Sequence, residues 1–386
     1  MKSRLITALV LVFTCFCLVT SSFGESQKQG LLLFNEGREI QKKATTKQER
    51  ELALSKYEHA LKIFEEVGYE TGSRMTLMNM GYIYGALNEH IKALETYQKA
   101  LELIRKENLP KHEGITLNNM GHSEEALGNY DRSLELFTQA LGLLTQVGDL
   151  KSQSSSLNNI ADIYNNRSKY KEALEYYEKS LEIKKRIGDK DGEATTINNM
   201  ALIYSKTSQY KKALDMYYKA LKMKREVGNS REEASALINI GNVYRAYGLY
   251  QRALNTFNDA LSINRKISDS SGEAAALNGV GLVYMTWGRY QLAQDSFEKI
   301  LTTAKKLNSP LLERAAINNI GETYYYRGEY QKALNLFNEA MPLAKRLGDL
   351  KAEATILGNK AEAAYSRLLQ NAEKTQNANQ LFVAFT

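Results

Sequence analysis

One unit of sequence recurs every 40 residues along most of this chain. Two tyrosines and one small residue mark the unit. The first tyrosine recurs at Tyr84, Tyr164, Tyr204, Tyr244, Tyr284 and Tyr324, the second at Tyr130, Tyr170, Tyr210, Tyr250, Tyr290 and Tyr330, and the small residue at Ala93, Ser133, Ala173, Ala213, Ala253, Ala293 and Ala333. No insertion or deletion interrupts residues 74–354, which therefore hold seven full copies. Such an array predicts stacked units that bury their apolar faces against their neighbours.

Each copy carries two helical patterns joined by a short break. In the copy that begins near residue 194, Ile197, Ala201 and Tyr204 share one face of a first helix, and Tyr210 and Tyr217 share one face of a second. In four copies the second helix is followed by a glycine that suits a left-handed cap, at Gly148, Gly188, Gly228 and Gly348. Only 3 of the 386 residues are proline. We therefore predict an all-α chain of helix pairs.

A small residue also holds one position of every first helix, at Gly81, Gly121, Ala161, Ala201, Gly241, Gly281 and Gly321. Small side chains at a fixed place allow two helices to approach closely, while large side chains fill the adjoining gaps. The periodicity accordingly assigns most of the 24 tyrosines to the core.

Residues 1–24 have the features of a signal peptide. Lys2 and Arg4 precede an uncharged, largely apolar stretch at 5–19, and small residues surround a predicted cleavage site after Gly24. The apolar stretch is short for an uncleaved anchor. We therefore expect an exported mature chain, periplasmic or secreted, that has no membrane span.

The regions that flank the seven copies depart from the repeat. Residues 25–73 match a degenerate helix pair, with Asn35 and Gly37 in its first half and about four residues inserted before the second. Residues 355–386 begin another copy and then lose the pattern. We predict that they form a C-terminal capping helix and a tail.

The residues of the repeat resemble the tetratricopeptide repeat over roughly residues 30–360. The matching positions in one copy are Ile197, Met200, Ala201, Tyr204, Tyr210, Ala213, Tyr217 and Ala220. The period of 40 is similar to the long-helix variety of kinesin light chains, Leu-Gly-Asn adaptor repeats, bacterial peptide-pheromone receptors and bacterial multi-repeat proteins. This resemblance implies a right-handed superhelical solenoid of stacked antiparallel helix pairs, whose first helices line a concave groove. A HEAT repeat of 40 residues is the competing fold.

The resemblance also implies a peptide-binding site made of asparagines. In the family, an asparagine two positions before the small residue often faces the groove and contacts the backbone of an extended peptide. That position holds Asn79, Asn119, Asn159, Asn199, Asn239 and Asn319, with Asn35 and Asn359 in the flanking regions and Gly279 as the exception. The preceding residue is also asparagine at Asn118, Asn158, Asn198, Asn278 and Asn318. Asp162 and Asn242, one residue after the small position, and Arg245, one turn further on, complete the predicted site.

A carboxamide carries two N–H donors and an acceptor oxygen, so a row of asparagines matches the groups of a peptide backbone. Two alternatives stay open. The amides could bond neighbouring helices of the chain itself, or the asparagines could persist only because the copies arose by duplication.

Other chemistries find little support in the sequence. The 51 basic and 44 acidic residues are interspersed, which disfavours a nucleic-acid binder. The four histidines lack metal-ligand spacing, and no nucleophile or phosphate-binding motif is present. We therefore expect no enzyme activity, cofactor or metal, and predict a scaffold or adaptor that binds a protein or peptide partner. The alternatives are a regulatory or substrate-recruiting arm of a separate or truncated enzyme, such as a caspase-like protease or kinase, and a self-associating structural scaffold.

Overall fold

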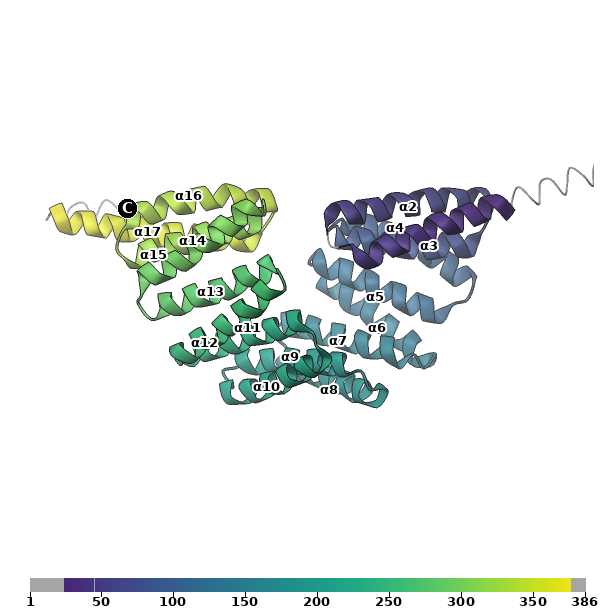
Figure 1. Ribbon diagram of the computed structural model, residues 1–386, viewed down its shortest axis with the longest axis horizontal. Helices are drawn as coiled ribbons and strands as arrows, with labels where there is room; N and C mark the ends of the chain where they lie inside the picture. Colours follow the sequence, from purple (N-terminus) through teal and green to yellow (C-terminus); the bar gives the residue numbers. More distant parts are fainter. Residues whose placement is uncertain (1–23, 45, 376–386) are drawn as a thin grey trace, which may run out of the picture. The chain divides into compact units, whose positions relative to one another are not determined.

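A computed structural model describes residues 24–44 and 46–375 of the chain. The predicted signal peptide, apart from Gly24, and the tail from residue 376 lie outside the described residues. All regular elements in the described ranges are α-helices, as the repeat predicts. The chain divides into two compact units, Met1–Asp189 (unit 1) and Lys190–Thr386 (unit 2). Figure 1 shows the helices of each unit following one another as hairpins.

In unit 1, residues 24–43 form the first described helix. It is followed by α2 (Lys47–Glu66), α3 (Glu70–Ala86), α4 (His90–Lys106), α5 (Pro110–Ala126), α6 (Tyr130–Gln146), α7 (Leu150–Asn166) and α8 (Tyr170–Ile187). Since three-residue turns separate the helices of a pair, the pairs α3–α4, α5–α6 and α7–α8 are antiparallel. Each first helix starts about four residues before the copy boundary that the tyrosine pattern suggests; α3, for example, starts at Glu70.

In unit 2 the same arrangement continues from residue 190. The helices are α9 (Lys190–Lys206), α10 (Tyr210–Val227), α11 (Ser230–Ala246), α12 (Tyr250–Lys266), α13 (Ser270–Thr286), α14 (Tyr290–Lys306), α15 (Pro310–Tyr326), α16 (Tyr330–Leu347) and α17 (Leu350–Thr375). The last of these has 26 residues and packs on α16, so a single long helix follows the last full pair.

The turns after second helices confirm the predicted glycine caps. Gly188 ends α8 with φ 71° and its N–H donates to the carbonyl groups of Lys184 and Lys185. Several turns place a non-glycine residue in the same left-handed region, at Asn88, Asn108, Ser168, Ser208, Ser268 and Asn308. Asparagine tolerates this conformation because its short polar side chain can hydrogen-bond locally.

Where the small position of a first helix is glycine, it lies against an aromatic ring of the paired second helix. A methyl group at Gly81 would lie 2.5 Å from a ring carbon of Tyr97, and one at Gly241 would lie 2.8 Å from Phe257. Gly37 meets Tyr57 in the same way, at 3.0 Å, which supports the proposed alignment of the degenerate first pair. These contacts confirm that the small residues serve close helix packing.

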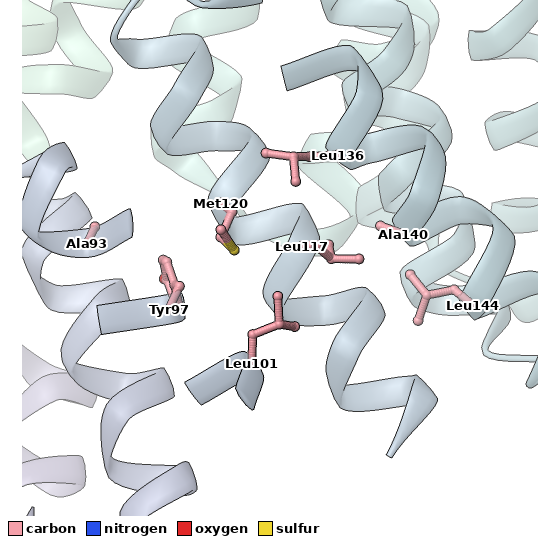
Figure 2. Close-up of a cluster of buried hydrophobic side chains, with 8 residues drawn as sticks. All are labelled: Ala93, Tyr97, Leu101, Leu117, Met120, Leu136, Ala140 and Leu144. Atoms are coloured by element: carbon pink, nitrogen blue, oxygen red, sulfur yellow. The ribbon is translucent and has the colours of Figure 1, made fainter. Parts of the chain in front are cut away.

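Within each unit, the core also joins neighbouring pairs. Figure 2 shows a cluster in unit 1 that draws on α4, α5 and α6 and consists of Ala93, Tyr97, Leu101, Leu117, Met120, Leu136, Ala140 and Leu144. Because neighbouring pairs of a unit share such clusters, apolar burial holds the copies of that unit together. The assignment of most tyrosines to the core is wrong, however. In the described part of the chain only six are buried, namely Tyr57, Tyr97, Tyr177, Tyr204, Tyr217 and Tyr244, since most of the others lie at helix ends and turns.

Candidate functional site

Two neighbouring cavities open on the face of the first helices α3 and α5 in unit 1. They have volumes of about 370 Å³ and about 280 Å³. Tyr82 and Asn119 line both. The first is also lined by Met75, Met78, Asn79 and His112, and the second by His90, Tyr97 and His122. Two predicted site residues, Asn79 and Asn119, are thus brought together at one hollow.

Helical spacing explains why these side chains converge. Met75, Asn79 and Tyr82 are separated by four and three residues, so they follow one another on one face of α3. Asn119 and His122 are three residues apart on α5, which packs beside α3. Tyr82 is 56% exposed and Met75 is 38% exposed. The face therefore offers apolar surface beside amide groups.

The histidines of these cavities differ in their surroundings. Burial lowers the pKa of His112, and the nearby charges of Arg74 and Lys111 add to the effect. Nε2 of His122 lies 3.1 Å from Nδ2 of Asn159, and its Nδ1 lies 3.8 Å from the carboxylate of Glu125. Nδ1 of His90 is buried without a hydrogen-bond partner. The hollow therefore combines apolar surface with amide and imidazole groups.

The predicted asparagines of unit 1 fall into two classes. Those two positions before the small residue are half-buried: Asn79 donates to the carbonyl of Met75 at 2.8 Å, and Asn119 hydrogen-bonds the hydroxyl of Tyr97. Those one position earlier, Asn118 and Asn158, are buried. Their burial leaves Asn118 and Asn158 little surface for a ligand.

The two buried asparagines bind other helices of unit 1. Nδ2 of Asn118 donates to Oγ of Ser156 on α7 at 2.8 Å. Oδ1 of Asn158 accepts from Oγ of Ser180 at 3.4 Å and from Nζ of Lys184 at 3.3 Å, both on α8. These amides therefore hold neighbouring helices together.

In unit 2 the asparagines form a ladder within the chain. Each rung joins an asparagine of one first helix to the asparagine 41 residues earlier, on the preceding first helix. The rungs run from Asn239 Nδ2 to Asn198 Oδ1 at 3.2 Å, from Asn319 to Asn278 at 2.7 Å, and from Asn359 to Asn318 at 3.1 Å. The alternative in which the amides bond neighbouring helices thus holds for these residues. Asn199 is half-buried on α9.

The ladder lacks one rung, between the first helices α11 and α13, because neither position holds an asparagine. Gly279 has no amide to donate, and Ile238, 41 residues earlier, has none to accept. A ring carbon of Phe257 lies 2.3 Å from where a Cβ of Gly279 would be. Aromatic packing therefore takes the place of the amide bond at this position.

The remaining predicted residues lie apart from the two cavities. Asp162 accepts a hydrogen bond from the hydroxyl of Tyr177, and burial raises the pKa of its carboxyl to about 6. Glu322 has the equivalent position in unit 2, accepts from Asn318 and Asn359, and also has a raised pKa through burial. Asn242 and Arg245 are half-buried on α11. Nε of Arg245 is buried without a hydrogen-bond partner.

Sequence reasoning missed the part of the hollow that departs from the repeat. Met78 stands where other copies have asparagine, His90 where they have tyrosine, and Gln41 belongs to the degenerate first pair. The replacement of repeated residues in adjoining copies was the available signal. No group of three or more His, Cys, Asp or Glu side chains in the described residues could hold a metal ion. None of the helices in this part of the chain has the length and apolar character to cross a membrane.

Comparisons with known proteins agree with this architecture. Family models described as tetratricopeptide repeat match residues 72–146, 152–226, 228–306 and 314–347, which together make up well over half of the chain. No curated protein matches the sequence.

Several solved structures share the fold. The apo form of the quorum sensor NprR from B. thuringiensis is 13% identical, with a TM-score of 0.63, and the match covers 81% of this chain and 87% of that one. A Rap protein complexed with competence and sporulation factor is 15% identical, with a TM-score of 0.52 and coverage of 88% and 99%. A signal transduction ATPase with a tetratricopeptide repeat sensor from Pyrococcus horikoshii is 14% identical, with a TM-score of 0.59 and coverage of 86% and 55%.

At these sequence identities, the similarity to the solved structures shows the fold alone. The family models rest on the sequence itself, and their matches cover most of the seven copies. The chain belongs to the tetratricopeptide repeat family, and its fold is an all-α solenoid of repeated helix pairs.

Proposed function

We propose that this protein is a non-enzymatic scaffold that binds an extended peptide segment of a partner protein on the first-helix face of unit 1. The observation that carries the proposal is the pair of adjoining cavities that share Tyr82 and Asn119. Tetratricopeptide repeats generally serve as protein interaction scaffolds, and this hollow is the place in unit 1 where predicted ligand-facing amides meet open space.

The chemistry of the hollow favours a peptide with apolar or neutral polar side chains. Nδ2 of Asn79 uses one amide hydrogen within its own helix, which leaves the rest of the carboxamide for the N–H and C=O of a ligand backbone. Tyr82 stands between the cavities, so neighbouring side chains of the ligand would enter on either side of its ring. Ordering the peptide has a cost, so micromolar affinity is the expected scale.

Two of the solved structures provide precedents of the same fold. One is described as a quorum sensor, and another is a Rap protein in complex with competence and sporulation factor. The second of them supports the proposal that a helix-pair array of this kind can hold another molecule in a complex.

We assign the primary contacts to unit 1 because the two adjoining cavities lie there, whereas the amides of unit 2 bond one another. Asn239 and Asn319 each donate to another asparagine of the chain. They retain the carbonyl oxygen and one amide hydrogen, so they serve as secondary contacts for a longer ligand.

The experiment is a selection of binders from a random peptide library displayed on phage, with residues 25–386 as the target. Selected peptides are then titrated by fluorescence anisotropy. The double variant Tyr82→Ala, Asn119→Ala should weaken binding at least tenfold. Leu202→Ala is the matched control, because Leu202 has the repeat position of Tyr82 in unit 2 and is also exposed. Selected peptides that bind the double variant as tightly as the native chain would refute the site.

We also propose that the chain is exported after removal of residues 1–24. The basic start and the uncharged stretch at 5–19 support this location. Mass spectrometry of the protein expressed in its host should find a chain that starts at Glu25 outside the cytoplasm. Replacement of Leu11 and Val12 by Lys should keep the full-length chain inside the cell, and export of that variant would contradict the proposal.

A further inference from the structure

The turns of unit 2 carry a row of aromatic side chains. Rings from consecutive turns pair with one another: Tyr210 with Tyr247 at 5.5 Å between centroids, Tyr250 with Trp287 at 5.8 Å, and Tyr290 with Tyr326 at 5.8 Å. We call these six residues the turn row. It lies at the junctions between first and second helices.

The turn row is open to solvent. Tyr247 and Tyr326 are each 55% exposed and Trp287 is 38% exposed, although each already contacts another ring. Large aromatic side chains that stay exposed in consecutive copies form an apolar strip rather than scattered surface residues. Such strips are typical of surfaces that bind another molecule.

Cations accompany the rings. The guanidinium of Arg289 lies 4.5 Å from the ring centroid of Trp287, and Nζ of Lys212 lies 4.0 Å from that of Tyr204. Lys211 and Arg252 lie on the same turns, with Asp215 as an acidic neighbour. At the far end of the row, Arg327 and Lys332 both pair with Glu329, and Glu322 and Glu362 lie beside Tyr326. The row is therefore positively charged in its part from Tyr210 to Trp287, and this charge favours an acidic partner.

One cavity shows the combination in detail. It has a volume of about 420 Å³ and is lined by Tyr210, Tyr247, Lys211, Lys212 and Asp215, among others. Its wall thus places two tilted rings beside two ammonium groups and one carboxylate. A flat apolar ring beside a carboxylate would match the rings and the ammonium groups.

The corresponding turns of unit 1 lack the row. Leu127 and Arg167 stand at the repeat position of Tyr247 and Trp287, and Arg167 pairs with Asp131 at 2.6 Å. Among the described residues of unit 1, no ring contact joins consecutive turns of this kind. The turn row is a property of unit 2 and not of the repeat.

We propose that the turn row of unit 2 binds an acidic, proline-containing extended segment of a partner protein. Proline rings in a polyproline helix stack on aromatic side chains, and that helix exposes its side chains without internal hydrogen bonds. Acidic residues between the prolines would pair with the lysines and arginines of the turns. This surface is separate from the peptide site of unit 1 and does not depend on it.

Trp287 is the only tryptophan of the chain, so its fluorescence reports directly on the row. We would titrate the mature chain with a 12-residue peptide of alternating Glu and Pro. The expected result is a saturable change that weakens severalfold when salt rises from 50 to 500 mM, because the charged contacts are exposed. A Lys-Pro peptide of equal length should give no saturable change.

The variants locate the binding. Tyr247→Ala with Tyr326→Ala should weaken binding at least tenfold, and Arg289→Gln should weaken it severalfold. Leu127→Ala, at the repeat position of Tyr247 in unit 1, should have no effect, and neither should Tyr82→Ala with Asn119→Ala. If circular dichroism shows that the double tyrosine variant does not fold, the binding of the peptide to Arg289→Gln is the test. The proposal is overturned if the Glu-Pro peptide gives no saturable change, if Arg289→Gln binds it equally, or if a 12-nucleotide oligothymidylate binds more tightly.

Discussion

The two units use the same pair of asparagines for different purposes. In unit 2, the second asparagine of one first helix donates to the first asparagine of the preceding one, as in the bond from Asn239 to Asn198. In unit 1 the first asparagine turns elsewhere, since Asn118 bonds Ser156. The second asparagine, Asn119, then lies at the two cavities.

A residue on the next first helix accounts for the difference. Ser156 lies 38 residues after Asn118 and offers a hydroxyl to it. Ala236 and Ala316 stand 38 residues after Asn198 and Asn278, and their side chains have no hydrogen-bonding group. The amides of unit 2 therefore satisfy one another, because a polar group that is removed from water needs a partner. The hydroxyl of Ser156 thus accounts for the difference between the two units. In unit 2 the asparagines bond one another, and in unit 1 Asn119 lies at the two cavities.

The largest expected effect tests whether each unit is stabilised by its own core. Phe137→Ala in unit 1 and Phe297→Ala in unit 2 remove rings that are 0% exposed. Each should cost about 3–5 kcal/mol of unfolding free energy. Because contacts in the array are local, hydrogen exchange should accelerate mainly in the unit that carries the substitution.

Leu292→Ala provides the control for these two variants, since Leu292 is 41% exposed. We expect it to change stability by less than about 1 kcal/mol. Equal acceleration of exchange in both units by Phe137→Ala would contradict a separation of the units.

A smaller effect is the pH dependence that a buried carboxyl of unit 1 gives to stability. Burial raises the pKa of Asp162 to about 6 in the folded chain, from an ordinary value of 3.8. The folded state therefore holds a proton that the unfolded state releases, and stability falls as pH rises from about 4 to about 6, by at most about 3 kcal/mol. Asp162→Asn should remove this loss, so it should stabilise the chain at pH 7 and leave it unchanged at pH 4. Urea unfolding at pH 4, 5 and 7 measures the difference.

The exposed Asp215 supplies the matched control, because Asp215→Asn should leave the pH dependence of the native chain in place. If Asp162→Asn and the native chain lose stability in parallel between pH 4 and 6, the burial of this carboxyl does not have the assigned consequence.

The smallest effect concerns the hydroxyl itself. Ser156→Ala leaves the buried amide of Asn118 without its partner and should cost about 1–3 kcal/mol. Ala236→Ser offers a new partner to Asn198 and should change stability by about 1 kcal/mol or less. Thermal unfolding of both variants, combined with Asn118→Ala and Asn239→Ala in double-mutant cycles, measures the coupling. Absence of coupling between residues 118 and 156 would mean that the hydroxyl does not decide between the two amide arrangements.

The helix pairs, their turns and the packing of glycine against an aromatic ring could be predicted from the sequence, because each depends on residues within one 40-residue copy. The partners of the asparagines could not, since Asn118 and Asn198 have the same neighbours in the repeat motif and differ in a residue 38 positions away. The turn row escaped prediction for another reason. Periodicity places Tyr210 and Tyr250 on the inward stripe, but they begin their helices, where the stripe reaches solvent.

The absent rung at Gly279 and Ile238 bears on how such a gene can change. A donor in one copy requires an acceptor in the copy before it, so the copies are not interchangeable even though their lengths are identical. Recombination could place the copy with Gly279 directly after the copy with Asn198. The amide oxygen of Asn198 would then lose its hydrogen-bond donor, whereas Ile238, in the copy that now precedes Gly279, has no amide that needs one. The order of the copies, and not only their number, is thus under physical constraint.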